Sequence, residues 1–125
     1  MNVLTVDDSR ASRLVIGRFL TDMGFNVTEA AEGTEGLRYL KAGRKFDALI
    51  VDSEMPGMSG VEFIRAVRSE AANLETPIIM ISNENSSDRM VEAIESGANE
   101  YIMKPFTKEI LAMKLDMLGV EAKRP

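Results

Sequence analysis

The chain has 125 residues, enough for one domain, and 45% of them are hydrophobic, which is ordinary for a globular protein. It contains no cysteine and no histidine, which excludes disulfides, thiolate zinc sites, Ser-His triads and cysteine nucleophiles. The formal net charge of −5 argues against sequence-independent binding of nucleic acid, because phosphate contacts require clusters of Lys and Arg. We see no signal peptide and no apolar stretch long enough to span a membrane, so we expect a cytoplasmic protein.

Five short segments predict β-strands, because each is rich in strand-forming residues and is bounded by turn or capping residues. The first, third and fourth are continuous apolar runs, as in the interior of a parallel sheet. The second alternates polar and apolar residues, which predicts a half-exposed edge strand. The predicted strands span residues 3–6, 26–29, 48–51, 78–81 and 101–103.

Between and after these strands, apolar residues recur at helical spacing, which predicts five helices. The third presents Ile64, Val67 and Ala71 on one face, and the fourth is expected to turn Val91 and Ile94 inward. The helices are predicted from the cap Ser9 to Gly24, over residues 34–41, from the cap Ser59 to about Ala71, from Ser86 or Ser87 to Gly97, and from the cap Thr107 to about Leu118.

The alternation of strands and helices predicts an α/β fold with a parallel sheet covered by helices on both faces. The polar second strand belongs at an edge, which favours the strand order 2-1-3-4-5 of doubly wound proteins. We therefore predict a flavodoxin-like, three-layer α/β/α domain with five strands and five helices over residues 1–119. Residues 120–125 would form a short C-terminal tail.

Polar side chains stand at the carboxyl ends of four predicted strands, where open α/β sheets bind ligands. Asp7 and Asp8 follow the first strand, and Asp52 ends the third. Ser82 ends the fourth strand and Lys104 ends the fifth. The fold would therefore bring three carboxylates, one hydroxyl and one ammonium group to one edge of the sheet.

Crowded carboxylates repel one another and raise their own pKa values, and a hard divalent cation such as Mg²⁺ removes that repulsion. The backbone carbonyl of Glu54, two residues after Asp52, is a further candidate ligand. A cation, a hydroxyl and an ammonium group suit phosphoryl transfer, in which catalysis is mostly positioning and charge neutralisation. With histidine and cysteine absent, the nucleophile would be a carboxylate, giving an aspartyl phosphate. Asp52 is the candidate, because the end of a central strand can hold a nucleophile rigidly and still expose it.

Four segments resemble the motifs of response-regulator receiver domains: "VDDS", "VDSEMPGMSG", "IIMIS" and "YIMKPF". The tail "GVEAKRP" is too short for an output domain, which favours a stand-alone receiver of the chemotaxis type. The resemblance covers nearly the whole chain. It implies that Asp8 ligates Mg²⁺ directly, that Asp7 helps through water, and that Mn²⁺ can substitute. It also implies that Asp52 accepts the phosphoryl group of a partner's phosphohistidine.

The same resemblance implies that Ser82 and Lys104 contact the phosphoryl group, and that Ser82 and Tyr101 form the conformational switch. Ser82 stands where threonine is commoner. Glu54 and Glu84 occupy two positions that vary among receiver domains. The residues at these positions tune the rate at which the aspartyl phosphate is hydrolysed. The Lys104-Pro105 bond resembles the cis peptide of the family.

The resemblance further implies a signalling switch rather than a turnover enzyme. Its expected partners are a sensor histidine kinase or a histidine phosphotransfer protein, a downstream target, and a phosphatase, with neither nucleic acid nor membrane insertion. The protein would be a monomer or a phosphorylation-dependent dimer. Chemotaxis is the favoured role, while a phosphorelay shuttle and a receiver cut from a longer regulator are the alternatives.

The last predicted helix carries two apolar stripes, although one stripe is enough to cover a sheet. The first stripe is Leu111, Leu115 and Leu118, and the second is Ile110, Met113 and Met117. Surplus Met-rich apolar surface favours a docking site formed by the fourth helix, the fifth strand with Tyr101, and the fifth helix.

Two other classes of protein compete with this interpretation. Glu54 has the spacing after Asp52 that metal-dependent phosphohydrolases use for their acid/base, but the chain has no cap domain or evident substrate pocket. A flavodoxin-like cofactor carrier would need a phosphate-binding loop after the first strand, and "DDSRAS" places two negative charges there instead.

Overall fold

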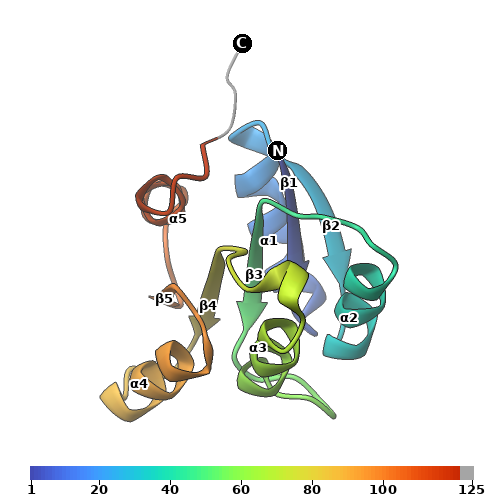
Figure 1. Ribbon diagram of the computed structural model, residues 1–125. Coiled ribbons are helices and arrows are strands. Elements are labelled where there is room, and N and C mark those ends of the chain that lie inside the picture. Colours follow the sequence, from blue (N-terminus) through green and yellow to red (C-terminus); the bar gives the residue numbers. More distant parts are fainter. Residues whose placement is uncertain (122–125) are drawn as a thin grey trace.

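The computed structural model describes residues 1–121, and within them five strands alternate with five α-helices (Figure 1). The strands are β1 (Asn2–Val6), β2 (Asn26–Ala30), β3 (Ala48–Asp52), β4 (Ile78–Ser82) and β5 (Glu100–Met103). The helices are α1 (Arg10–Asp22), α2 (Gly33–Lys41), α3 (Gly60–Arg68), α4 (Ser87–Ser96) and α5 (Lys108–Met117), with a 3₁₀ turn, η1 (Ala71–Asn73), before β4.

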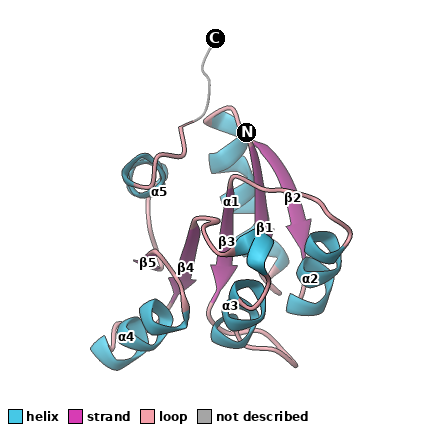
Figure 2. Cartoon of the chain, in the orientation of Figure 1, coloured by secondary structure: helices cyan, strands magenta, loops and turns pink. Residues whose placement is uncertain are grey.

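All strand pairs are parallel, and the sheet order is β2-β1-β3-β4-β5, which confirms the predicted topology. The helices form a layer on each face of the sheet, and Figure 2 shows α2, α3 and α4 together on the nearer face. Val6 of β1 is aligned with both Ala30 of β2 and Val51 of β3, and Asp52 is aligned with Ile81 of β4. This register brings the carboxyl ends of the central strands to one edge.

The sheet separates two hydrophobic clusters, because successive side chains of a strand point to opposite faces. In β3, Ile50 belongs to the cluster beneath α1 and α5, which contribute Leu20 and Leu111. Leu49 of the same strand belongs to the cluster beneath α3, which contributes Phe63. All five residues of β3 are buried, so the strand that ends at Asp52 is held from both sides.

Four of the helices begin with a side-chain cap, as predicted from Ser9, Ser59, Ser86 and Thr107. Each of these hydroxyl groups accepts a hydrogen bond from a backbone N–H in the first turn. At α3 the Glu62 carboxylate also accepts from the backbone N–H of Ser59, completing a capping box that lowers the pKa of Glu62.

Two predictions about helix faces are wrong. Val91 and Ile94 of α4 are 52% and 46% exposed, and the buried positions of α4 are the small residues Ala93 and Ser96. An apolar stripe indicates only that one face is apolar, and in α4 the sheet is covered by the smaller side chains. Ala71 does not continue α3, because that helix ends at Arg68 and Ala71 is exposed in η1.

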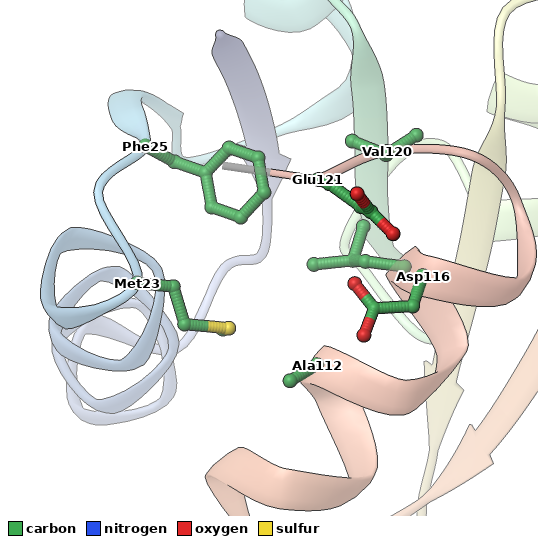
Figure 3. A pocket seen from close by; sticks show the side chains of 7 residues that line it. Met23, Phe25, Ala112, Asp116, Val120 and Glu121 are labelled. Atoms are coloured by element: carbon green, nitrogen blue, oxygen red, sulfur yellow. The ribbon is translucent and has the colours of Figure 1, made fainter. Parts of the chain in front are cut away.

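A hollow of about 330 Å³ lies between the C-terminal ends of α1 and α5 (Figure 3). Its lining includes Met23, Phe25 and the acidic side chains of Asp116 and Glu121. Val120 lines it too and is buried in the hydrophobic core, although it begins the predicted tail. Residues 122–125 of that tail lie outside the described residues. Among the helices of residues 1–121, none has the length and apolarity needed to cross a membrane.

Candidate functional site

The polar residues predicted at the strand ends come together at the carboxyl edge of the sheet. Asp7 directly follows β1, Asp52 and Ser82 are the last residues of β3 and β4, and Lys104 directly follows β5. Figure 1 shows the arrowheads of the sheet directed toward this edge. A hollow of about 460 Å³ opens over it, and its lining includes Asp8, Asp52 and Lys104.

The three carboxylates form one cluster. An oxygen atom from each of Asp7, Asp8 and Asp52 lies within 4.8 Å of the others. Asp7 is buried and Asp8 is exposed, so the cluster extends from the interior to solvent. Oδ1 of Asp7 accepts a hydrogen bond of 2.9 Å from the backbone N–H of Ser9. Oδ2 of Asp7 is buried and accepts no hydrogen bond within residues 1–121.

Lys104 supplies positive charge to this cluster. Its Nζ lies 3.1 Å from Oδ1 of Asp52 and 3.6 Å from Oδ2 of Asp7. Its backbone N–H donates to the carbonyl of Ser82 at 2.8 Å, which fixes the end of β5 against the end of β4. The Lys104-Pro105 peptide bond is cis, as the resemblance implied.

The pKa of Asp52 is raised even though the ammonium group of Lys104 lies beside it. Burial raises the pKa of the Asp52 carboxyl above its usual range, and the charge of Asp7 raises this pKa further. The hydrogen bond and charge of Lys104 act in the opposite direction but do not cancel the increase. The ionised form of Asp52 is therefore disfavoured in the fold, first by burial and then by the neighbouring carboxylates.

The donor set fits a hard divalent cation. Mg²⁺ takes oxygen ligands and is usually held by one or two carboxylates and several waters. A buried carboxylate oxygen without a hydrogen bond is costly, and a cation is one partner that satisfies it. Oδ2 of Asp7 is such an atom, and the carboxylates of Asp8 and Asp52 lie within reach of a shared ion.

Ser82 and Tyr101 lie beside the carboxylate cluster. Ser82 is buried, and its hydroxyl oxygen accepts hydrogen bonds from Ser53 and from the backbone N–H of Glu84. Tyr101 is half-buried and donates its hydroxyl proton to the carbonyl of Glu84 at 2.8 Å. Ser82, Glu84 and Tyr101 line one small cavity of about 40 Å³.

The two glutamates predicted to tune hydrolysis lie at different places around the site. Glu54 is exposed and lines the hollow over Asp52. Glu84 lines the small cavity, and its Oε2 forms an ion pair of 3.1 Å with Nε of Arg89 on α4. Ser53 was not predicted as a site residue. A serine that directly follows a strand has no pattern in sequence that distinguishes it from an ordinary turn residue.

Three of the four side chains predicted for the partner surface are exposed, and the fourth, Tyr101, is half-buried. Ile110, Met113 and Met117 of α5 are all exposed, with Met117 the most exposed at 63%. Val91 and Ile94 of α4 are exposed as well.

The model of the response regulator receiver domain family matches residues 3–116, and the chain belongs to this family. It is a receiver domain of the type found in chemotaxis proteins. Chemotaxis protein CheY of Pseudomonas aeruginosa is 40% identical over 119 residues, covering 94% of this chain and 95% of the relative. Chemotaxis protein CheY1 of Helicobacter pylori is 39% identical, covering 94% of this chain and 96% of the relative.

Solved structures of receiver domains have the same fold as this chain. Chemotaxis protein CheY4 of Vibrio cholerae superimposes with a TM-score of 0.88 at 38% identity, covering 94% of this chain and 97% of that structure. A response regulator from Chloroflexus aurantiacus superimposes with a TM-score of 0.89 at 29% identity, covering 94% of this chain and 95% of that structure.

Proposed function

We propose that this receiver domain is a phosphorylation-activated signalling switch in which Asp52 accepts a phosphoryl group. The observation that carries the proposal is the contact of Lys104 with both Asp52 and Asp7, at the edge where three carboxylates meet. This arrangement places a nucleophilic oxygen beside an ammonium group and a cluster of cation ligands. All three are needed where negative charge is transferred onto a carboxylate.

In the proposed reaction a carboxylate oxygen of Asp52 attacks the phosphorus of a partner's phosphohistidine. The P–O bond to Asp52 forms as the P–N bond breaks, and the histidine nitrogen keeps the electron pair. Lys104 and the hydroxyl of Ser82 stabilise the transferred oxygens by charge and by hydrogen bonding. Asp7, Asp8, Asp52 and the carbonyl of Glu54 would hold Mg²⁺ or Mn²⁺, which when bound neutralises phosphoryl charge.

The phosphoryl group is proposed to act on the partner surface through Ser82 and Tyr101. Ser82 would move toward the phosphoryl oxygens, and the ring of Tyr101 would then turn inward. The surface of α4, β5 and α5 would change as a result, and with it the affinity for a target protein. Glu54 and Glu84 would set the lifetime of the phosphoryl group.

The names of the relatives favour a role in chemotaxis, with a histidine kinase or a histidine phosphotransfer protein as the phosphodonor. On this proposal the protein acts in the cytoplasm and binds neither nucleic acid nor membrane. It catalyses only its own phosphorylation and dephosphorylation. Residues 1–119 would form the receiver unit.

The test is the intact mass of the protein after incubation with acetyl phosphate, with Mg²⁺ or with a chelator. One phosphoryl adduct that requires both Mg²⁺ and Asp52 is expected. The control is Asp52→Asn, which keeps the shape of the side chain and removes the nucleophile. A folded wild-type protein that gains no mass, or an adduct that persists in Asp52→Asn, would refute the proposal.

A further inference from the structure

The hydroxyl group of Ser82 is held by two donors. The hydroxyl of Ser53 donates to Oγ of Ser82 at 2.8 Å, and the backbone N–H of Glu84 donates to the same oxygen at 3.0 Å. A serine oxygen has two lone pairs and one proton. With Ser53 as the donor in their contact, both lone pairs are engaged, and the O–H bond of Ser82 takes the remaining direction.

The proton of Ser82 remains available. In this arrangement the Ser82 hydroxyl donates to no acceptor within residues 1–121, although this side chain is only 1% exposed. A buried hydroxyl donor without an acceptor is unusual, because buried polar groups are normally paired. A phosphoryl oxygen on Asp52, the residue directly before Ser53, is an acceptor that phosphorylation would bring to this place.

Ser53 is itself held firmly. Its backbone N–H donates to the carbonyl of Ile81 at 2.9 Å, and its carbonyl accepts from the N–H of Gly60 at 3.0 Å. Its side chain lines both the hollow over Asp52 and the small cavity that contains Ser82 and Tyr101. Ser53 therefore lies between the phosphorylation site and the switch residues.

We propose that Ser53 is a positioning residue for phosphorylation, which orients the hydroxyl of Ser82 so that its proton is presented to the phosphoryl group on Asp52. A serine side chain needs such a partner more than a threonine does, because it lacks the second substituent on Cβ that restricts χ1. A donor that is already oriented needs less reorganisation as charge develops on the transferred group. This inference rests on the proposed function of Asp52.

The test is the rate of Mg²⁺-dependent phosphorylation by acetyl phosphate, measured by intact mass, in a double-mutant cycle. The variants are Ser53→Ala, Ser82→Ala and the combination of both, with circular dichroism to verify folding. Ser69→Ala is the matched control, because the Ser69 hydroxyl is exposed near the far end of α3 and donates only to the carbonyl of Ala66.

Ser53→Ala is expected to slow phosphorylation by about three- to tenfold, the kinetic equivalent of one hydrogen bond. In the Ser82→Ala background the same change should alter the rate by less than about twofold, because Ser53 acts only through Ser82. The Ser69→Ala control should match the wild-type rate.

Three results would overturn the inference while leaving the proposed function intact. One is a wild-type rate in Ser53→Ala. Another is a faster rate, which would mean that Ser53 sequesters the Ser82 proton. The third is equal slowing in both backgrounds, which would mean that Ser53 acts independently of Ser82. A folded wild-type protein that takes up no phosphoryl group refutes the proposed function, and the inference falls with it.

Discussion

Lys104 and Asp52 are 52 positions apart in the chain and form an ion pair in which Nζ lies 3.1 Å from Oδ1. The same ammonium group lies 3.6 Å from the buried carboxylate of Asp7. One cation therefore pairs with two acidic residues at the ends of two different strands, β1 and β3. Its loss would leave both carboxylates without a compensating charge.

The first prediction is that Lys104→Met lowers phosphorylation by acetyl phosphate at least about tenfold, because the transferred oxygens lose a charged partner. Without Mg²⁺ the free energy of unfolding should fall by about 1–3 kcal/mol, as expected when a partner of a buried charge is removed. Intact mass measures the first effect, and urea unfolding followed by circular dichroism measures the second.

Lys114→Met is the matched control, because Nζ of Lys114 pairs with Glu100 at 2.7 Å, away from the carboxylate cluster. This variant should be phosphorylated at the wild-type rate. Equal rates in Lys104→Met and Lys114→Met would contradict the role of Lys104.

The second prediction concerns stability without metal. Because burial and Asp7 raise the pKa of Asp52, the folded state binds the Asp52 proton more tightly than the unfolded state does. Above the unfolded pKa the ionised group destabilises the fold, so Asp52→Asn should stabilise the metal-free protein at pH 7 by about 0.5–2 kcal/mol. Urea unfolding in a chelator measures the difference.

The sign of this effect also predicts its pH dependence. The advantage of Asp52→Asn should shrink as the pH falls toward the ordinary pKa of an aspartic acid side chain, since the wild-type carboxyl then becomes protonated in both states. Added Mg²⁺ should also reduce the advantage, because the cation stabilises the ionised wild-type site. A less stable Asp52→Asn variant in chelator at pH 7 would contradict this account of the site.

The third prediction concerns Gly60, the first residue of α3. A methyl group there would overlap the carbonyl oxygen of Asp52 and lie 2.9 Å from Cα of Ser53. Gly60→Ala should therefore destabilise the fold by about 1–3 kcal/mol and slow phosphorylation, since the backbone that carries Asp52 must shift. Urea unfolding and intact mass measure the two effects.

Gly17→Ala provides the control for this substitution. Gly17 lies in α1, and no atom approaches the position of an added methyl group within 4 Å. The variant should be more stable than the wild type by about 0.5–1 kcal/mol, because alanine is the better helix former. Equal stability and equal phosphorylation of Gly60→Ala and Gly17→Ala would show that close packing around Gly60 does not position Asp52.

The fourth prediction concerns the partner surface. Met117→Glu should change the free energy of unfolding by less than about 0.5 kcal/mol and leave phosphorylation unchanged, because this side chain is 63% exposed. Binding of the phosphorylated protein to its target should be weakened, because a charge would enter an apolar contact. Affinity chromatography of an extract from its own cells, with phosphorylated protein as bait, compares the variant with wild type.

Leu74→Glu is the control for the partner surface, because Leu74 is 59% exposed beside η1, outside α4, β5 and α5. It should retain the same bound proteins as the wild type. Retention of the same proteins by Met117→Glu would contradict the proposed surface.

The strand order and the assembly of the carboxylate cluster were predictable from local patterns. Buried strands are continuous apolar runs, capping residues mark the helix starts, and parallel topology brings strand ends to one edge. Asp7, Asp52, Ser82 and Lys104 could therefore be placed together from the sequence alone, and the structure brings them together.

The predictions that were wrong or missing concern features that depend on tertiary packing rather than on local sequence. The spacing of Val91 and Ile94 has the same period whether the apolar face of α4 covers the sheet or faces solvent. The hydrogen bond between Ser53 and Ser82 joins residues 29 positions apart, and it depends on side-chain directions that no local pattern encodes. The end of α3 at Arg68 was missed for a related reason. The guanidinium of that residue donates to the carbonyl of Gly97, which lies 29 positions away in the chain.

The sheet order also divides the charges of the site between the two halves of the chain. β1, β2 and β3 lie within residues 1–52 and bring the three acidic side chains together, whereas Lys104 follows β5. A growing chain emerges from the ribosome N-terminal half first, and parallel pairing is slow. The acidic cluster is thus synthesised before its ammonium counter-charge. Lys104 can therefore compensate the acidic cluster only after β5 has paired with β4.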